Sequence, residues 1–554
     1  MKPRPLGVAL GALALLLSGC AVVPTSGPVN QVPGLPAGAG EPVVGVIARP
    51  PRAGMSQGDI VSGFLDAMAS PTDNYAIARQ YLTPTRAASW DPTIRTMVYD
   101  GPGELDQVGS HAVRLTAASV GAIDVNRRWT AAQPDDQIDA NFGLVSAGDS
   151  WRIASSPNGL LLTGGDLARG YRGYPVYFSA PSGQVLVADG AVIAAEAANT
   201  ATILTKLLLA GPPLWLAGAV RTGFPTGTEL AIDSVPVVNG VAQVSLTTRV
   251  LRATVAERTL LAAQLTSTLA AVPGVFSVVI TTAGQPLPIS GQGASLSVDQ
   301  WTNLLPDAQT PTDATFVGKN GVSVFSAGTI KPLKGAKVAG IINSPIRNLG
   351  RTRIAGLRAD NSAVIARPDG SGVKELDNST GVSGLNFDHS GRVWAVRNGL
   401  LLSWDSLGKS IPVIEPEGLR VDRFALAPDG VRIALSRLVS GGTQLVVGAV
   451  LRRPDGLHVQ GLHAVSRNAS SPSDIAWSDE TRVVVLSLSP SVSLVTVSAI
   501  SGENSGIVSV PLALDVTASA RGGILVGASN GTIWQTGTTL AQQIAVGREP
   551  SYGG

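Results

Sequence analysis

The sequence predicts a multidomain protein in which two α+β domains precede an all-β C-terminal propeller of five or six blades. Three observations predict this fold class. Helical spacing gives way to strand alternation within residues 57–165, the order β, α, β, β, α, β runs through residues 173–288, and a turn-and-strand unit recurs from residue 314 to 554. Hydrophobic residues make up 44% of the 554-residue chain, which is enough for several packed cores.

The first 19 residues predict a lipoprotein signal peptide. Lys2 and Arg4 form a short basic head, and an apolar run of Leu, Ala, Gly and Val follows over residues 6–17. A helix that spans a bilayer needs roughly 20 apolar residues, and this run is shorter. The segment therefore indicates an export signal rather than a permanent membrane span.

Cys20, the single cysteine of the chain, stands directly after Leu17-Ser18-Gly19. These four residues resemble the bacterial lipobox, and the resemblance implies that Cys20 becomes the mature N-terminus and carries a diacylglycerol thioether. A lone cysteine cannot form an internal disulfide, whereas two or more acyl chains such as palmitate anchor a protein stably. We expect lipidation at Cys20 and a location on the outer face of the cell membrane.

Residues 20–56 are predicted to tether the folded domains to this anchor, because they are rich in Pro and Gly and lack a sustained hydrophobic period. In polyproline geometry such a tether would reach roughly 100 Å. The net charge of the chain is +2 and no Lys/Arg run is interleaved with aromatic residues, which argues against nucleic acid as a partner.

The first folded domain, residues 57–165, is predicted to place helices before a curved sheet. Ile60 and Phe64 have helical spacing, Asp59 can cap the start of their helix, and Pro84 ends a second helix. Three alternating stretches then predict the strands of the sheet, at residues 112–125, 137–157 and 159–163.

A second α+β domain is predicted over residues 173–288. A hairpin-like start is followed by an amphipathic helix, a strand pair within residues 222–246, and a helix that leads to a last strand. The segment contains Val176-Tyr177-Phe178, Leu208 through Gly211-Pro212, Thr222 with Pro225 and Gly227, Val244-Ser245-Leu246, Gln264 with Thr268-Leu269, and Gly274-Val275 leading to Val278. Through these residues it resembles the GerMN domain of sporulation and germination proteins.

This GerMN-like domain shows no set of acids, bases or metal ligands, and Ser245 stands where family members often carry an acidic residue. We therefore expect it to bind protein rather than to catalyse a reaction. Residues 289–313 are predicted as a linker, because Gly291, Gly293 and Pro306 punctuate them.

From residue 314 to residue 554, five units share a hydrophobic position, a polar turn and an alternating strand. The turn residues taken as equivalent are Asp360, Ser390, Asp429, Asp479 and Arg521, at intervals of 30, 39, 50 and 42 residues. Propeller blades recur at about 40–50 residues, so the units predict a propeller. The Pro-Asp-Gly turns at 368–370, 428–430 and 454–456 are predicted as strand connectors. The tryptophans predicted to fill the spaces between blades are Trp394, Trp404, Trp477 and Trp534.

No catalytic residue, cofactor or metal site is predicted, so the protein is not expected to be an enzyme. Residues 527–531 match the G-x-S-x-G pattern around Ser529, but the last histidine, His463, precedes that serine and the motif joins two strands. His458 and His463 are an odd number of residues apart on a predicted strand, which places them on opposite faces rather than in one metal site.

The order of lipobox, Pro-rich tether, α+β domain, GerMN-like domain and propeller resembles the actinobacterial LpqB-type lipoproteins along essentially the whole chain. The resemblance implies an accessory lipoprotein that binds the extracellular domain of the MtrB sensor kinase and modulates signalling through the MtrA response regulator, for cell-wall and division homeostasis.

A second interpretation stays open, in which the propeller funnel binds a cell-wall glycan. Glycan hydrolysis would need two carboxyl groups about 5–10 Å apart, and the propeller strands are poor in Asp and Glu. The sequence therefore favours glycan binding over glycan processing within this alternative.

Overall fold

The computed structural model describes residues 48–439, 442–466, 472–488, 493–502, 504–537 and 541–553. Residues Pro42–Gly554 belong to one compact unit. Residues 1–47, which include the predicted signal peptide, Cys20 and most of the predicted tether, lie outside the described residues, so the predictions made for them stay predictions. Within the described ranges, no helix is both long enough and apolar enough to cross a membrane.

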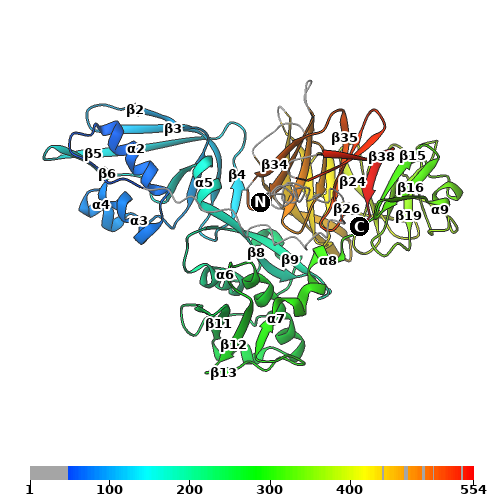
Figure 1. The fold of residues 1–554 in the computed structure, drawn as a ribbon, viewed down its shortest axis with the longest axis horizontal. Helices are drawn as coiled ribbons and strands as arrows, with labels where there is room; N and C mark the ends of the chain where they lie inside the picture. Colours follow the sequence, from blue (N-terminus) through cyan, green and yellow to red (C-terminus); the bar gives the residue numbers. More distant parts are fainter. Residues whose placement is uncertain are drawn as a thin grey trace, which may run out of the picture. The chain divides into compact units, whose positions relative to one another are not determined.

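The N-terminal domain packs three helices against a seven-stranded sheet, drawn in blue and cyan in Figure 1. The helices are α2 (Gln57–Met68), α3 (Thr72–Gln80) and α4 (Pro84–Ser89). The strands are β1 (Thr96–Tyr99), β2 (Glu104–Gln107), β3 (Ala112–Ile123), β4 (Trp129–Ala131), β5 (Gln137–Ala147), β6 (Ser150–Ser155) and β7 (Leu160–Thr163). Their order is β6-β5-β3-β1-β7, with β2 and β4 paired to β3, which gives the predicted α+β arrangement.

The start of α2 differs slightly from the predicted cap. Ser56 is the N-cap residue, and Asp59 completes a reciprocal capping box from the third helical position. Ile60 and Phe64 are fully buried, and the ring of Phe64 lies 5.4 Å from that of Trp90. The predicted helical spacing therefore does mark the face that packs into the core.

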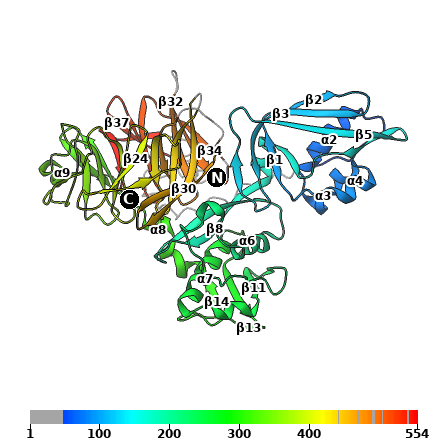
Figure 2. The ribbon, with the colours of Figure 1, turned by 180° about the vertical axis from the view of Figure 1, so that it is seen from behind.

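The GerMN-like domain follows α5 (Gly164–Gly170) and consists of a hairpin, two helices and a second sheet. The hairpin pairs β8 (Tyr171–Ser179) with β9 (Leu186–Ala194). The sheet has the order β10 (Val237–Val238), β11 (Val241–Leu246), β12 (Ser277–Thr282) and β13 (Gln285–Pro286). Helices α6 (Thr200–Leu209) and α7 (Val255–Ala270) lie between the hairpin and this sheet in both Figure 1 and Figure 2.

The strand pair predicted within residues 222–246 is shorter than expected. Before β11, the chain forms only the two-residue strand β10 and an isolated bridge between Leu230 and Leu246. Pro225 and Pro236 have no backbone N–H to donate, and Gly227 has a positive φ of 77°, so a continuous ladder cannot form here.

Residues 289–313, predicted as a linker, contain further structure. They form β14 (Ser295–Ser297), which pairs with β12, the 3₁₀ helix η3 (Val298–Leu304) and the short helix α8 (Pro306–Gln309). Trp301 is buried in the core of the GerMN-like domain. The Gly and Pro residues favoured a linker. Their spacing gives no sign that Trp301 packs this segment against the core of the domain.

The described part of the C-terminal region contains six sheets, which agrees with the predicted propeller of five or six blades. The first sheet contains β15 (Ala314–Gly318), β16 (Gly321–Ser326) and β17 (Thr329–Pro332), and helix α9 (Lys334–Val338) follows it; the second contains β18 (Asn343–Arg347), β19 (Ile354–Leu357), β20 (Ala363–Ala366) and β21 (Lys374–Glu375). The third sheet contains β22 (Ser383–Phe387), β23 (Val393–Arg397), β24 (Leu400–Trp404) and β25 (Ser410–Ile411). The fourth contains β26 (Val413–Ile414), β27 (Val421–Leu426), β28 (Arg432–Val439), β29 (Gly442–Arg453) and β30 (Gly456–Ala464).

The last two sheets and the closing strand complete this list. They are β31 (Pro472–Trp477), β32 (Arg482–Leu488), β33 (Ser493–Ala499), β34 (Asn504–Ser509); β35 (Ala513–Ser519), β36 (Gly523–Ala528), β37 (Thr532–Thr536), β38 (Ala541–Val546); and β39 (Arg548–Tyr552). Strand β39 pairs antiparallel with β15 and so joins the C-terminal end of the chain to the first sheet.

One of the five residues predicted to mark equivalent blade turns, Asp360, is assigned wrongly. Asp360 lies between the second and third strands of its sheet, β19 and β20, whereas the other four turns lie between first and second strands. The equivalent residue is Asn348, whose Oδ1 accepts the N–H groups of Thr352 and Arg353 as aspartates do in other blades. Counting Asn348, Asp388, Asp429, Asp479 and Ser519 gives more regular intervals of 40, 41, 50 and 40 residues.

The four propeller tryptophans lie where they were predicted. Trp404 packs in a core shared by the second and third sheets, Trp477 in one shared by the fourth and fifth, and Trp534 against one shared by the fifth and sixth. Trp394 is fully buried and packs with residues of β27 and β28. These side chains therefore hold neighbouring sheets together.

Candidate functional site

The residues considered for catalysis or metal binding do not come together. His111 lies in the N-terminal domain beside Ser110, His389 lies in the β22–β23 turn, and His458 bonds Asp455. Ser529 follows β36 and donates its N–H to the Leu512 carbonyl, in a strand-to-strand turn as predicted. Over the described ranges, no group of three or more His, Cys, Asp or Glu side chains could hold a metal ion.

A ring of β-bulges surrounds the channel of the propeller. The innermost strands are β18, β22, β27, β31, β35 and β39, and the pairing of each one shifts register near its first residues. A bulge leaves a residue unpaired and turns it out of the ladder. Residues of all six strands line a cavity of about 370 Å³, here called the channel cavity. The lining residues that lie at a bulge or directly after it are Ser344, Gly384, Arg423, Asp474, Asp515 and Glu549.

Three consecutive inner strands place a carboxylate at this position. Asp474 accepts the N–H of Val516 in the next sheet at 2.8 Å, and Asp515 accepts the N–H of Glu549. Glu549 in turn accepts the N–H of Ser344, which lies in β18. The three carboxylates therefore connect four inner strands in sequence along one side of the channel.

Burial and mutual repulsion change the protonation of these acids. The pKa of Asp474 is raised to about 7, chiefly by burial and also by the charge of Asp515, while the N–H of Val516 and the charge of Arg423 act in the opposite direction. Burial, followed by the charge of Glu549, also raises the pKa of Asp515. Near neutral pH the channel cavity thus offers both hydrogen-bond donors and acceptors to hydroxyl, amine or amide groups.

This arrangement was not predicted, because the propeller strands are poor in Asp and Glu and the few acids within them did not indicate a site. Asp474 and Asp515 stand inside the innermost strands, five residues before Asp479 in the β31–β32 turn and four residues before Ser519, the last residue of β35 before its turn. An acid repeated at a nearly fixed distance from the blade turn is a signal that could have identified the channel cavity.

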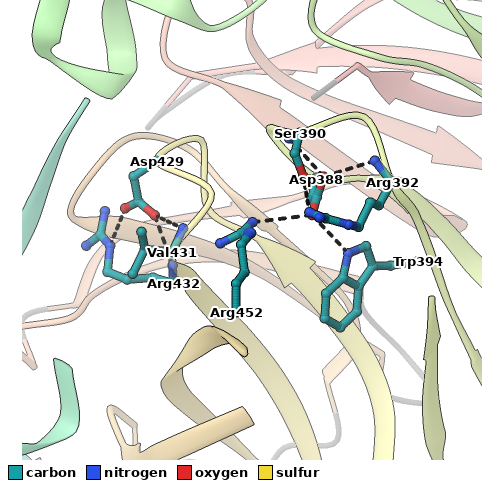
Figure 3. A network of polar contacts seen from close by, with 8 residues as sticks. All are labelled: Asp388, Ser390, Arg392, Trp394, Asp429, Val431, Arg432 and Arg452. Atoms are coloured by element: carbon teal, nitrogen blue, oxygen red, sulfur yellow. Dashed lines mark hydrogen bonds and ion pairs between the residues drawn. The ribbon is translucent and has the colours of Figure 1, made fainter. Parts of the chain in front are cut away.

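The blade turns of Asp388 and Asp429 form a network of polar contacts, shown in Figure 3. Asp429 accepts the Nε of Arg432 at 2.5 Å, and both side chains are completely buried. One turn earlier in the propeller, Asp388 accepts Nη2 of Arg452 at 3.3 Å. The guanidinium of Arg432 also stacks over Trp477, with 4.9 Å from its carbon to the ring centroid.

The GerMN-like domain is bonded to the propeller beside this network. Arg432 donates Nη1 to the carbonyl of Ala188 in β9 at 2.8 Å, and the hydroxyl of Tyr177 in β8 donates to Glu480. The backbone of Tyr177 is held by α7, because it donates to Thr268 at 3.0 Å and accepts from Gln264 at 2.9 Å. Two positions of the GerMN resemblance thus orient the side chain that reaches the propeller.

Large apolar side chains are exposed at one end of the GerMN-like sheet. Phe276, directly before β12, is 75% exposed, and Val237 and Val238 of the edge strand β10 are also exposed. The N–H of Phe276 donates to the carbonyl of Gly240 in the β10–β11 turn at 2.8 Å, which keeps the three side chains at the same end. We call Val237, Val238 and Phe276 the apolar edge.

Three family descriptions match consecutive parts of the chain. Residues 50–168 match "Lipoprotein LpqB, N-terminal domain", residues 175–288 match "Sporulation and spore germination", and residues 321–548 match "Lipoprotein LpqB beta-propeller domain". These matches cover the three folded regions in the order in which the structure shows them.

Curated relatives match along most of their length. A protein named Lipoprotein LpqB from Streptomyces coelicolor is 30% identical, covering 87% of this chain and 86% of the relative. Another of the same name from Cutibacterium acnes is 29% identical and covers 90% and 89%. Among solved structures, a gluconolactonase from Xanthomonas campestris has a TM-score of 0.28 at 19% identity, covering 37% of this chain and 76% of that chain, which is too distant for any argument.

Proposed function

Because this chain belongs to the LpqB lipoprotein family, we propose that it is held by a lipid at Cys20 on the outer face of the membrane, where it binds the ectodomain of an MtrB-like sensor kinase and modulates its signalling. In this proposal the protein carries out no chemistry of its own. Its folded domains supply the contact surface, and the tether sets how far that surface stands from the bilayer.

The apolar edge is the observation that carries this proposal. A short edge strand with exposed Val237 and Val238, next to a largely exposed Phe276, offers both apolar area and free backbone groups to a partner. Anchoring both proteins in one membrane raises their effective concentration, so that modest intrinsic affinity is enough for association.

The test is calorimetric titration of the lipid-free protein, residues 42–554, with the purified kinase ectodomain up to about 100 μM, so that a Kd in the micromolar range is detected. Phe276→Asp should weaken binding at least tenfold, since an aromatic residue at the centre of an interface contributes roughly 2 kcal/mol or more. Leu407→Asp is the matched control, because Leu407 is 69% exposed on the propeller and should not affect binding.

Two results would contradict the proposal. One is the absence of binding by the wild-type protein over this concentration range. The other is an equal loss of affinity with Phe276→Asp and Leu407→Asp, which would mean that the apolar edge has no special part in the contact.

A second candidate function is binding of a cell-wall glycan in the channel cavity. The acids Asp474, Asp515 and Glu549 favour it, because carboxylates in a recess are suited to bind the hydroxyl groups of a sugar. Titration with soluble wall glycan fragments tests it. Asp515→Asn should abolish any saturable binding, and turnover of the fragments would instead indicate a glycan-processing enzyme.

A further inference from the structure

We propose that the propeller carries a membrane-docking surface around helix α9, where exposed cations and apolar side chains meet the anionic headgroups of a phospholipid bilayer. We call Lys331, Lys334, Lys337 and Arg367 the basic surface. None of these residues belongs to the apolar edge or lines the channel cavity, so the proposal goes beyond the proposed function. It depends neither on the kinase contact nor on lipidation at Cys20.

Positive charge is concentrated in the first two sheets of the propeller. Residues 314–375 contain ten Lys and Arg against three Asp and Glu, a net charge of +7, whereas the whole chain carries +2. Two cations of this segment, Arg347 and Arg351, are paired with Asp313. The four cations of the basic surface are exposed, and none of them forms an ion pair with a carboxylate among the described residues. Their charge is therefore available to an anionic partner.

Helix α9 holds two of these cations at the outer margin of the propeller, where it is labelled in both Figure 1 and Figure 2. On one side of the helix, Ala336 and Ala339 pack into a core shared by the first two sheets. On the other side, Lys334, Lys337 and Val338 are exposed. Residues three and four apart lie on the same face of a helix, so these three side chains point outward together.

The other two cations lie beside this helix. Lys331 belongs to the edge strand β17, which directly precedes α9. Arg367 precedes the turn at 368–370, and α9 is packed against that turn so closely that Gly335 has no room for a side chain. The carboxylate of Asp369 in this turn accepts a backbone N–H of the turn itself. Segments of two neighbouring sheets thus bring the four cations to one region.

Exposed apolar side chains stand among the cations. Val338, next to Lys337, is 68% exposed, and Ile330, next to Lys331, is 50% exposed. Basic residues with apolar neighbours are typical of surfaces that lie on an anionic bilayer, because the cations attract the headgroups and the apolar groups enter the acyl boundary. A soluble anionic polymer of the cell wall would leave both apolar side chains in water. The surface therefore fits a bilayer better than such a polymer.

The expected strength of docking follows from the number of cations. Each cation close to an anionic membrane strengthens binding roughly fivefold, and this gain falls off within a Debye length. The three lysines together therefore contribute up to about 100-fold in affinity. The predicted tether reaches roughly 100 Å, which keeps the basic surface of an anchored chain within reach of the bilayer and raises its effective concentration there.

Vesicle co-sedimentation tests the proposal on the lipid-free protein, residues 42–554, with no kinase present. The vesicles consist of phosphatidylcholine alone or with about one-third phosphatidylglycerol, at about 0.1 M and about 1 M salt, where the Debye length falls from ~10 Å to ~3 Å. We expect at least tenfold tighter binding to the anionic vesicles at the lower salt, and loss of most of this preference at the higher salt. The kinase titration is a separate measurement, so this proposal and the proposed function fail independently.

Removal of the three lysine charges should weaken binding to the anionic vesicles at least tenfold, in the variant Lys331→Gln with Lys334→Gln and Lys337→Gln. A matched control removes the same charge from exposed positions outside the propeller and should change the affinity less than about twofold. This control consists of Arg95→Gln, Arg114→Gln and Arg252→Gln. All substituted side chains are exposed, so we expect both variants to fold.

Val338→Ser separates a bilayer from a soluble polyanion. It should weaken binding to the anionic vesicles at least about threefold, because less apolar area enters the bilayer. Equal binding of the wild-type protein to neutral and anionic vesicles would overturn the proposal, and so would equal losses in the lysine variant and the arginine control. A Val338→Ser variant that binds as the wild type would also contradict it, because charge alone would then hold the protein.

Discussion

Replacing Arg432 with methionine tests how strongly the blade turn holds the GerMN-like domain to the propeller. The side chain is 0% exposed, pairs with Asp429, donates to Ala188 and stacks over Trp477. Methionine keeps much of the volume but leaves Asp429 as a buried charge without its cation. Breaking such a pair costs about 3–5 kcal/mol, mainly because the remaining ion has been taken out of water.

Arg482 provides a matched comparison. It pairs with Asp479 at the same three-residue offset in the next blade, at 2.6 Å, but the two side chains keep 32% and 14% of their exposure. Water screens this pair, so Arg482→Met should cost only about 1 kcal/mol. The two substitutions are chemically identical and differ chiefly in burial.

Differential scanning calorimetry measures the difference through the unfolding transition of the propeller. For a unit of this size, 1 kcal/mol lowers Tm by about 2–4 °C, so we expect about 6–20 °C for Arg432→Met and about 2–4 °C for Arg482→Met. Adding Asp429→Asn to Arg432→Met should recover part of the loss, because the unpaired charge is removed. Equal shifts for the two single variants would refute the argument that burial sets the contribution of the pair.

Three further predictions follow from the sequence and the structure. Cys20→Ser should abolish incorporation of a fatty-acid probe in cells, and equal labelling of variant and wild type would contradict the lipobox assignment. Because burial raises the pKa of Asp474 to about 7, the folded state keeps a proton that the unfolded chain releases near pH 4, so stability should fall as the pH rises from about 4 to 7. The urea midpoint should fall between pH 5 and pH 8 in the wild type and should fall less in Asp474→Asn. An equal fall of the midpoint in the two proteins would refute this prediction. Limited proteolysis should cut first within residues 290–295, which are mostly exposed, and spare the segment around buried Trp301; early cuts inside the blades would contradict this.

Sequence reasoning succeeded where a pattern repeats or a local rule applies. Strand alternation and blade turns identified the propeller, and the GerMN motif located Gln264 and Thr268, which bond the backbone of Tyr177. It failed where side chains from distant segments decide the structure. The contact of Tyr177 with Glu480 joins residues that are 303 positions apart, and no local sequence pattern predicts it.

The blade register shows a second kind of limit. Asp360 also lies in a polar turn between two strands, so the shared plan does not distinguish it from Asn348, which makes the backbone hydrogen bonds of the equivalent turn with its amide oxygen. The channel acids were missed for a related reason, since a bulge changes which side chains face inward and cannot be seen from alternation alone.

The measurement that tests the central claim most directly is kinase autophosphorylation in proteoliposomes that contain the full-length sensor kinase and the lipidated protein together. We predict that the wild-type protein and Leu407→Asp change the autophosphorylation rate to the same extent. With Phe276→Asp, the rate should equal that of the kinase in liposomes without this protein. A rate that is the same with and without the wild-type protein would contradict the account, and so would a Phe276→Asp variant that acts like the wild type.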